Sequence, residues 1–270
     1  MRWPASWAVL CLVLSHVPAL ADQADDQFDV AAGHYARARW ELAWHEFDQF
    51  LKQYGSHPRA DDARFFRGES AMQLRRYREA RDDYRQYLKS GGTRHATLAR
   101  FRIGEAGYLL ADGPQAIQDL QFFLNEHPSD PLAMRALPYL AELQLAAGDV
   151  EAAERSFRHA LEQFPRGPLE DECRLGLARC LQRRQQLDEA ALYFRAIAAK
   201  RGSPLAPRAQ YSLAAGEYAA GRIETAMAEY QRLIDQYPDS PWAARAMIGQ
   251  ARCLHHQNRH KQAEALLRPL

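Results

Sequence analysis

Residues 229–243 read EYQRLIDQYPDSPWA, and residues 119–133 read DLQFFLNEHPSDPLA. In the first stretch the apolar residues share one face of a helix, and they are Tyr230, Leu233, Ile234 and Tyr237. Pro238 stops this helix, Asp239 or Ser240 can cap the next one, and Pro241 suits its first turn. The second stretch has the same order of residue types, so the chain repeats one joint between helices.

The joint belongs to a longer repeat, which is visible on alanines spaced 36 or 37 residues apart. These anchors are Ala43, Ala80, Ala116, Ala153, Ala190, Ala226 and Ala263. A small residue stands twelve residues before each anchor, and a large apolar residue stands four residues after it. For the first six anchors, a Gly or Pro stands twelve residues after the anchor. The spacing predicts a helix that carries the anchor and ends at the Gly or Pro, preceded by a second helix. Turn-forming residues lie between the two, at Gly148, Gly221, Asn258 and the pair Asp112–Gly113.

Each copy is therefore predicted to be a helical hairpin whose apolar face only stacked neighbours can bury. The hairpin with Ala214, Gly221, Ala226, Tyr230 and Pro238 resembles the tetratricopeptide repeat (TPR) family, and the resemblance extends from residue 28 to the end. Two features depart from the family: the period exceeds about 34 residues, and the early Trp of the first helix is missing. The resemblance implies an all-α right-handed solenoid of about seven hairpins, expected as one domain over residues 22–270. The joints are similar to those of bacterial periplasmic repeat proteins, namely the BamD-like outer-membrane assembly lipoproteins and the Tol-Pal-associated YbgF (CpoB) proteins.

The N-terminus reads MRWPASWAVLCLVLSHVPALADQ. Arg2, a short apolar core over residues 7–17, and the small residues around Leu20 are typical of a secretory signal peptide cleaved after Ala21. The alternatives are a buried N-terminal helix and lipidation at Cys11. We expect export to the periplasm or cell envelope, with peripheral association with the outer membrane as one arrangement. No later stretch is apolar enough to predict a transmembrane segment.

The chain has 35 basic and 34 acidic residues. This balance gives the chain as a whole no electrostatic attraction to nucleic acid. At the C-terminus, Leu266, Leu267 and Leu270 stand where a repeat array usually has a polar cap, and Pro269 falls inside the expected last helix. The array is expected to be cut from a longer chain, and docking of this end on a partner is the alternative.

No residue pattern indicates catalysis, and neither a cofactor nor a metal is expected. Cys173, Cys180 and Cys253 occupy positions of small packing residues. His256 and His260 have a spacing that can hold zinc on a continuous helix, but Asn258 marks a turn between them. The acid pairs Asp61–Asp62 and Asp82–Asp83 point in different directions on a helix and make no dyad. Phosphate-loop, nucleophile-elbow and zinc-protease motifs are absent from the sequence.

The resemblance implies that the first helix of each hairpin lines an inner groove. The groove candidates are Phe65, Glu69, Phe101, Glu105, Tyr108, Glu142, Arg179, Arg208, Tyr211, Tyr218 and Arg252. Three carboxylates at equivalent positions would repel one another unless a cation or a cationic partner lies there. Two alternatives stay open: the aromatic residues belong to the core, and the Glu residues pair with Arg of neighbouring hairpins. The Lys/Asn clamp of chaperone-binding repeats is missing.

We therefore expect a non-enzymatic, exported protein–protein interaction scaffold of the bacterial cell envelope, which presents a concave groove to another envelope protein or peptide segment. Two alternatives belong to other classes. One is a regulatory arm of a longer envelope enzyme, suggested by the apolar C-terminus. The other is a peptidoglycan- or carbohydrate-binding module, suggested by the groove aromatics.

Overall fold

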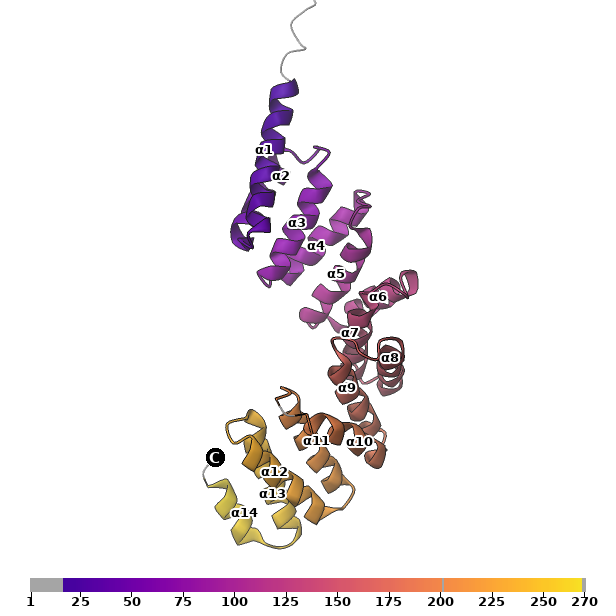
Figure 1. Cartoon of the computed structure of the whole chain (residues 1–270), viewed down its shortest axis with the longest axis vertical. Helices are drawn as coiled ribbons and strands as arrows, with labels where there is room; N and C mark the ends of the chain where they lie inside the picture. Colours follow the sequence, from indigo (N-terminus) through magenta and orange to yellow (C-terminus); the bar gives the residue numbers. More distant parts are fainter. Residues whose placement is uncertain (1–16, 201, 269–270) are drawn as a thin grey trace, which may run out of the picture. The chain divides into compact units, whose positions relative to one another are not determined.

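The computed structural model describes residues 17–200 and 202–268. Within these residues the regular structure is entirely helical, and it forms two compact units divided between Leu110 and Ala111 (Figure 1). Residues 1–16, which hold most of the predicted signal peptide, lie outside the described residues. The predicted cleavage after Ala21 falls within the first described helix, and both the signal peptide and the single domain over residues 22–270 stay predictions. None of the described helices has the length and apolarity required to cross a bilayer.

The first unit contains five helices. They are α1 (Val17–Ala36), α2 (Trp40–Gln53), α3 (Ala60–Gln73), α4 (Tyr77–Lys89) and α5 (Ala96–Leu109). Each helix packs against the next, and α1 also contacts α3. Because consecutive helices pack in pairs and the pairs stack, this unit is a stack of helical hairpins, as the repeat predicts.

The second unit continues the same pattern. Its helices are α6 (Gly113–Glu126), α7 (Ala133–Ala146), α8 (Val150–Gln163), α9 (Glu170–Arg183), α10 (Leu187–Ala198), α11 (Ala206–Ala219), α12 (Ile223–Gln236), α13 (Pro241–His256) and α14 (His260–Leu267). Neighbouring helices pack on each other from α6 to α14, and α7 also contacts α9, as α11 contacts α13. These contacts of α1 with α3, α7 with α9 and α11 with α13 join odd-numbered helices of one unit, which are the first helices of the hairpins. Within each unit we call the surface of these helices the odd-helix face.

The alanine anchors and their apolar partners form the core, which confirms the predicted register. The seven anchors are at most 9% exposed, and the large residues four positions later are buried in the first six hairpins. The small residues on the first helices allow this packing. A Cβ added at Gly68 would lie 3.0 Å from the Tyr84 ring of the same hairpin.

A second set of close contacts joins one hairpin to the next. A Cβ added at Gly176 would lie 2.1 Å from the ring of Phe157, and one at Gly249 would lie 2.3 Å from the ring of Tyr230. In both cases the ring belongs to the preceding hairpin. Absence of a side chain at these glycines therefore lets the aromatic residue four positions after an anchor reach across the stack.

The turn within each hairpin has a left-handed residue five positions before the anchor. Three of the seven turn residues are the predicted Gly148, Gly221 and Asn258. The other four are Ala38, Arg75, Ala111 and Gln185, with φ of 54°, 59°, 55° and 63°. In the third hairpin Ala111 takes the left-handed conformation, so the expectation of an Asp112–Gly113 turn is corrected by one residue. At Ala38, Arg75 and Gln185 the packing of the two flanking helices imposes a backbone conformation that these side chains do not favour.

The joints between hairpins follow the predicted chemistry with local variation. Ser240 caps α13, and its Oγ accepts a hydrogen bond of 3.2 Å from the backbone N–H of Trp242, with Pro241 in the first turn. In the earlier copy of this joint, a carboxylate oxygen of Asp130 accepts a 2.8 Å hydrogen bond from the backbone N–H of Leu132. The stretch quoted first is thus a structural joint between two hairpins.

Candidate partner-binding surface

The structure places four predicted groove residues of the first unit in its interior. Phe65 is 2% exposed, Glu69 6%, Phe101 0% and Glu105 2%. Tyr108, which lies near the end of α5, is half-buried. Burial in the core is the alternative that the sequence leaves open for the aromatic residues, and in the structure it holds for Phe65 and Phe101. These four side chains offer a partner almost no surface.

Arg102 lies between the two buried carboxylates and donates to both. Its Nε and Nη2 donate to the Oε1 and Oε2 of Glu69 at 2.8 and 3.0 Å, and its Nη1 donates to Glu105 at 2.5 Å. The Tyr84 hydroxyl donates a further 2.6 Å hydrogen bond to Glu69. Burial lowers the pKa of Arg102, but the two carboxylates outweigh that effect and raise it. A cation therefore lies between these two carboxylates, and for Glu69 it comes from the neighbouring hairpin, which is the pairing with Arg that the sequence left open.

The third carboxylate of the predicted column, Glu142 on α7, lies in the second unit. Both of its oxygens accept hydrogen bonds from Arg179 Nη1 on α9, at 2.8 and 2.9 Å. Both side chains are partly exposed, at 34% for Glu142 and 26% for Arg179. This pair joins adjacent hairpins. It matches the alternative that the Glu residues pair with Arg of neighbouring hairpins.

Arg208 on α11 differs from the arginines before it on the odd-helix face. Its side chain is half-buried, and no described carboxylate lies within 4.0 Å of it. Burial and the neighbouring Arg179 lower its pKa, Glu142 raises it, and Arg245 lowers it further. Arg208 is thus a partly desolvated cation whose surroundings are mostly cationic.

Aromatic side chains lie beside this arginine. Tyr211, one turn after Arg208, has its ring centroid 5.4 Å from that of Trp242 on α13. The guanidinium of Arg245 lies over the Trp242 ring at 4.6 Å, a cation–π arrangement. Trp242 is the part of this surface that our sequence reasoning missed, although it stands in the quoted stretch, because its repeat position suggests only a place near a helix start.

Further along the same face, Tyr218 and Arg252 border a shallow cleft. The cleft has a volume of about 300 Å³ and is also lined by His255 and His256. The rings of Tyr218 and His256 are 6.4 Å apart, and those of His255 and His260 are 4.6 Å apart. The structure therefore brings Tyr218 and Arg252, two of the groove candidates, to one cleft.

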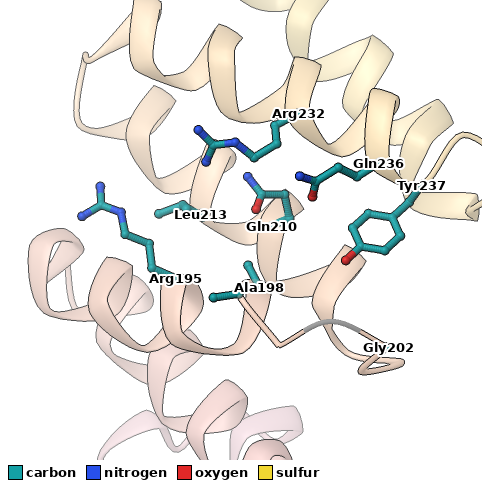
Figure 2. A pocket seen from close by; sticks show the side chains of 9 residues that line it. Arg195, Ala198, Gly202, Gln210, Leu213, Arg232, Gln236 and Tyr237 are labelled. Carbon is teal, nitrogen blue, oxygen red and sulfur yellow. The ribbon is translucent and has the colours of Figure 1, made fainter.

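A larger cleft of about 620 Å³ lies among α10, α11 and α12 (Figure 2). Figure 2 shows Arg195 and Arg232, from the two even-numbered helices, and Gln210 of α11 among the side chains that line it. Both arginines are already engaged: Arg195 donates to buried Glu217 at 2.9 Å and Arg232 to buried Glu229 at 2.6 Å. The charges of this cleft are therefore balanced within the chain.

The potential metal ligands of the described residues do not form a cluster. No group of three or more metal-ligating side chains occurs among them. The thiols of Cys173, Cys180 and Cys253 are buried and free, which confirms their role as packing residues. Burial raises their pKa, to about 12 for Cys173 and about 11 for the other two, so they hold little of the reactive thiolate at neutral pH.

The repeat geometry agrees with comparisons with known proteins. One tetratricopeptide repeat model matches residues 30–94, 67–131, 110–168, 139–201 and 175–241, and a second tetratricopeptide repeat model matches residues 217–270. The chain belongs to the tetratricopeptide repeat family. Repeats of this family generally form non-catalytic scaffolds that bind protein partners.

Individual relatives are distant. A TPR repeat-containing protein of Treponema pallidum (strain Nichols) is 27% identical over 115 residues, which are 43% of this chain and 47% of the relative, so the match spans about half of that protein. A tetratricopeptide repeat protein from Parabacteroides merdae aligns with a TM-score of 0.66 at 16% identity, over 91% of this chain and 90% of that structure. Pseudomonas aeruginosa pilF aligns with a TM-score of 0.58 at 19% identity, over 83% of this chain and 96% of that one. Such low identities show the shared fold alone.

Proposed function

We propose that this chain is an exported protein–protein interaction scaffold of the bacterial cell envelope, and that it binds its partner on the odd-helix face of the second unit. The observation that carries the proposal is the contrast between the two units. In the first unit the predicted groove residues Glu69 and Glu105 are buried and share hydrogen bonds from Arg102. On α11 and α13, by contrast, Arg208, Tyr211 and Arg252 retain exposed surface.

Export rests on the sequence. The basic, apolar and small-residue segments of residues 1–21 follow the order of a secretory signal. The joints of the repeat support the finer relation to the BamD-like and Tol-Pal-associated periplasmic proteins. Fusing residues 1–30 to a reporter enzyme that is active only outside the cytoplasm tests this part. We expect activity and a mature N-terminus at Asp22, whereas an inactive, uncleaved fusion would contradict export.

The scaffold itself is tested by purifying the tagged full chain from envelope extract and identifying the proteins that accompany it. Tyr218→Ala on α11 should reduce recovery of the partner severalfold, because partly exposed aromatic residues contribute strongly to interfaces. Tyr193→Ala on the even-numbered helix α10 is the matched control, since Tyr193 is also partly buried in the same unit. If no protein accompanies the wild type, or if both variants lose it equally, the proposed scaffold surface is wrong. Retention on purified cell wall without any protein would instead favour a carbohydrate-binding module.

A further inference from the structure

The arginines of the second unit fall into two groups according to their partners. On the even-numbered side, Arg195 and Arg232 each hold a buried carboxylate. On the odd-helix face, Arg179 is the last arginine that is paired with a carboxylate, the partly exposed Glu142. The three that follow on α11 and α13 have no described carboxylate within 4.0 Å, and they are Arg208, Arg245 and Arg252. Positive charge is therefore left uncompensated on one face.

The position of Arg208 makes this charge costly to the chain. Arg208 is half-buried, and the charges of Arg179 and Arg245 act on it with the same sign, while the charge of Glu142 offsets part of their effect. An arginine keeps its proton at neutral pH, so it cannot relieve the repulsion by becoming neutral. An anion that bound between these guanidiniums would remove the repulsion and replace the lost hydration.

The spacing of the arginines suits an extended segment. Arg208 and Arg245 are 37 residues apart and occupy the same position in successive hairpins. Their helices, α11 and α13, contact each other, which places the axes of packed helices about 8–10 Å apart. In an extended chain the side chains on one face are two or four residues apart, about 7 or about 13 Å, and these distances bracket the spacing of the two helices. One strand-like segment can thus present a carboxylate to each arginine.

An aromatic pair lies on the same two helices as the arginines. The Tyr211 and Trp242 rings meet at a centroid distance of 5.4 Å and an angle of 41°. Arg208 precedes Tyr211 by one turn, and the guanidinium of Arg245 lies over the Trp242 ring at 4.6 Å. The surface therefore combines two guanidiniums with two aromatic rings.

We propose that the surface formed by Arg208, Tyr211, Trp242 and Arg245 binds an extended acidic segment of a partner protein. Asp or Glu carboxylates of that segment receive the two guanidiniums, and an apolar side chain between them packs on the aromatic pair. This inference rests on the proposed scaffold function and adds the chemistry of the partner. A protein segment fits better than nucleic acid, because the basic surface is narrow and the chain carries 35 basic against 34 acidic residues.

Fluorescence anisotropy with defined probes tests the inference on the full chain. The probe is a labelled peptide of about eight residues in which Glu pairs flank single Phe residues, long enough to span both arginines. The comparison probes are the same peptide with Lys for Glu, phosphatidylglycerol vesicles and single-stranded DNA. We expect the acidic peptide to bind most tightly, with an affinity that falls as salt is added.

Single substitutions then locate the binding site. Arg208→Gln or Arg245→Gln should weaken binding of the acidic peptide about tenfold or more, as expected for loss of a charge-assisted hydrogen bond. Arg155→Gln is the control, because Arg155 is an exposed arginine on the even-numbered helix α8 without a described carboxylate within 4.0 Å. Arg208→Gln should also unfold at the same or a higher temperature than the wild type, since it removes a repelled cation. Loss of binding with intact stability separates a binding role from a structural one.

Several outcomes would overturn the inference. These are equal binding of the acidic and Lys peptides, no binding of the acidic peptide, an equal loss with Arg155→Gln, and vesicles or DNA binding as tightly through the same arginines. The two proposals fail separately. If partner recovery from extract depends on Tyr218 but is unchanged in Arg208→Gln, the scaffold stands and its partner is not held by acidic residues here.

Discussion

Replacing Arg102 by Met should destabilise the first unit more than any surface change. Arg102 is the shared donor to Glu69 and Glu105, whose side chains are 8% and 3% exposed. Met keeps most of the volume and the apolar stem but removes the charge. Two carboxylates would then remain buried, with the Tyr84 hydroxyl as the donor left to Glu69.

The magnitude follows from the burial of this network. Removing one partner of a buried ion pair costs about 3–5 kcal/mol, because the remaining charge is left uncompensated. The exposed Arg94, which holds Asp62 at 3.4 Å with a 75% exposed side chain, is the matched control in the same unit. Its replacement by Met should change the free energy of unfolding by less than about 1 kcal/mol.

Hydrogen exchange measured by mass spectrometry can localise the effect. A loss of about 3–5 kcal/mol corresponds to exchange roughly a hundredfold to several thousandfold faster in the core amides of α3–α5. Amides of α11–α13 serve as the internal reference. Adding Glu69→Gln to Arg102→Met should restore part of the loss, since a neutral amide needs no cation. If Arg102→Met leaves exchange in α3–α5 within tenfold of wild type, the network does not hold this unit together.

Three further predictions concern the packing, the turns and the pH response. Each is tested by urea unfolding monitored by circular dichroism. Gly176→Ala should lower the free energy of unfolding by about 1–3 kcal/mol, because its Cβ would lie 2.1 Å from the Phe157 ring. Phe157→Leu in the same chain should recover part of that loss. An unchanged urea midpoint would contradict the close contact. Gln185→Gly should raise the free energy of unfolding by about 0.5–1 kcal/mol, because glycine adopts a φ of 63° without strain. Gly148→Ala, at a φ of 89° with open space around it, should lower it by about 1 kcal/mol or more. The reverse signs would refute the left-handed turns. Burial lowers the pKa of His95 below its usual 6.5, so the folded protein favours the neutral imidazole ring. The stability that this ring contributes above pH 6.5 should therefore be lost as the pH falls below that value. His95→Phe should remove this part of the pH dependence.

The repeat period carries most of the information about the fold. Because Ala43 and its six counterparts recur every 36 or 37 residues, one register predicts the buried face of every hairpin. The structure buries all seven anchors. The same register predicts the joints, since Pro238 cannot continue a helix and Ser240 can cap one. Such local rules are repeated seven times, so an error at one copy is corrected by the others.

The turn conformations were only partly predictable. Gly148, Gly221 and Asn258 indicate a left-handed residue, but Ala38 and Gln185 take the same conformation without any favourable propensity. Their backbone is set by the two helices that they connect. Tertiary packing supplies this constraint, and a local sequence contains no trace of it.

The candidate surface shows a deeper limit of sequence reasoning. Repeat positions place Glu69, Glu105 and Glu142 in one column and suggest a single electrostatic feature. Their partners lie elsewhere in the repeat, however: Arg102 precedes Glu105 by three residues and follows Glu69 by 33, whereas Arg179 follows Glu142 by 37. Whether a charge is compensated depends on which side chains reach it and how much water remains around it.

That same dependence explains why the unpaired arginines could not be distinguished in advance. Arg179 and Arg208 lie in adjacent hairpins, and the sequence marks both as groove candidates. One reaches Glu142 at 2.8 Å, and the other lies among cations without a described carboxylate within 4.0 Å. In a chain whose total charge is nearly balanced, specificity arises from such local imbalance. A scaffold can therefore keep its stability in compensated pairs such as Arg102 with Glu69, and use for recognition the few charges that folding leaves without a partner.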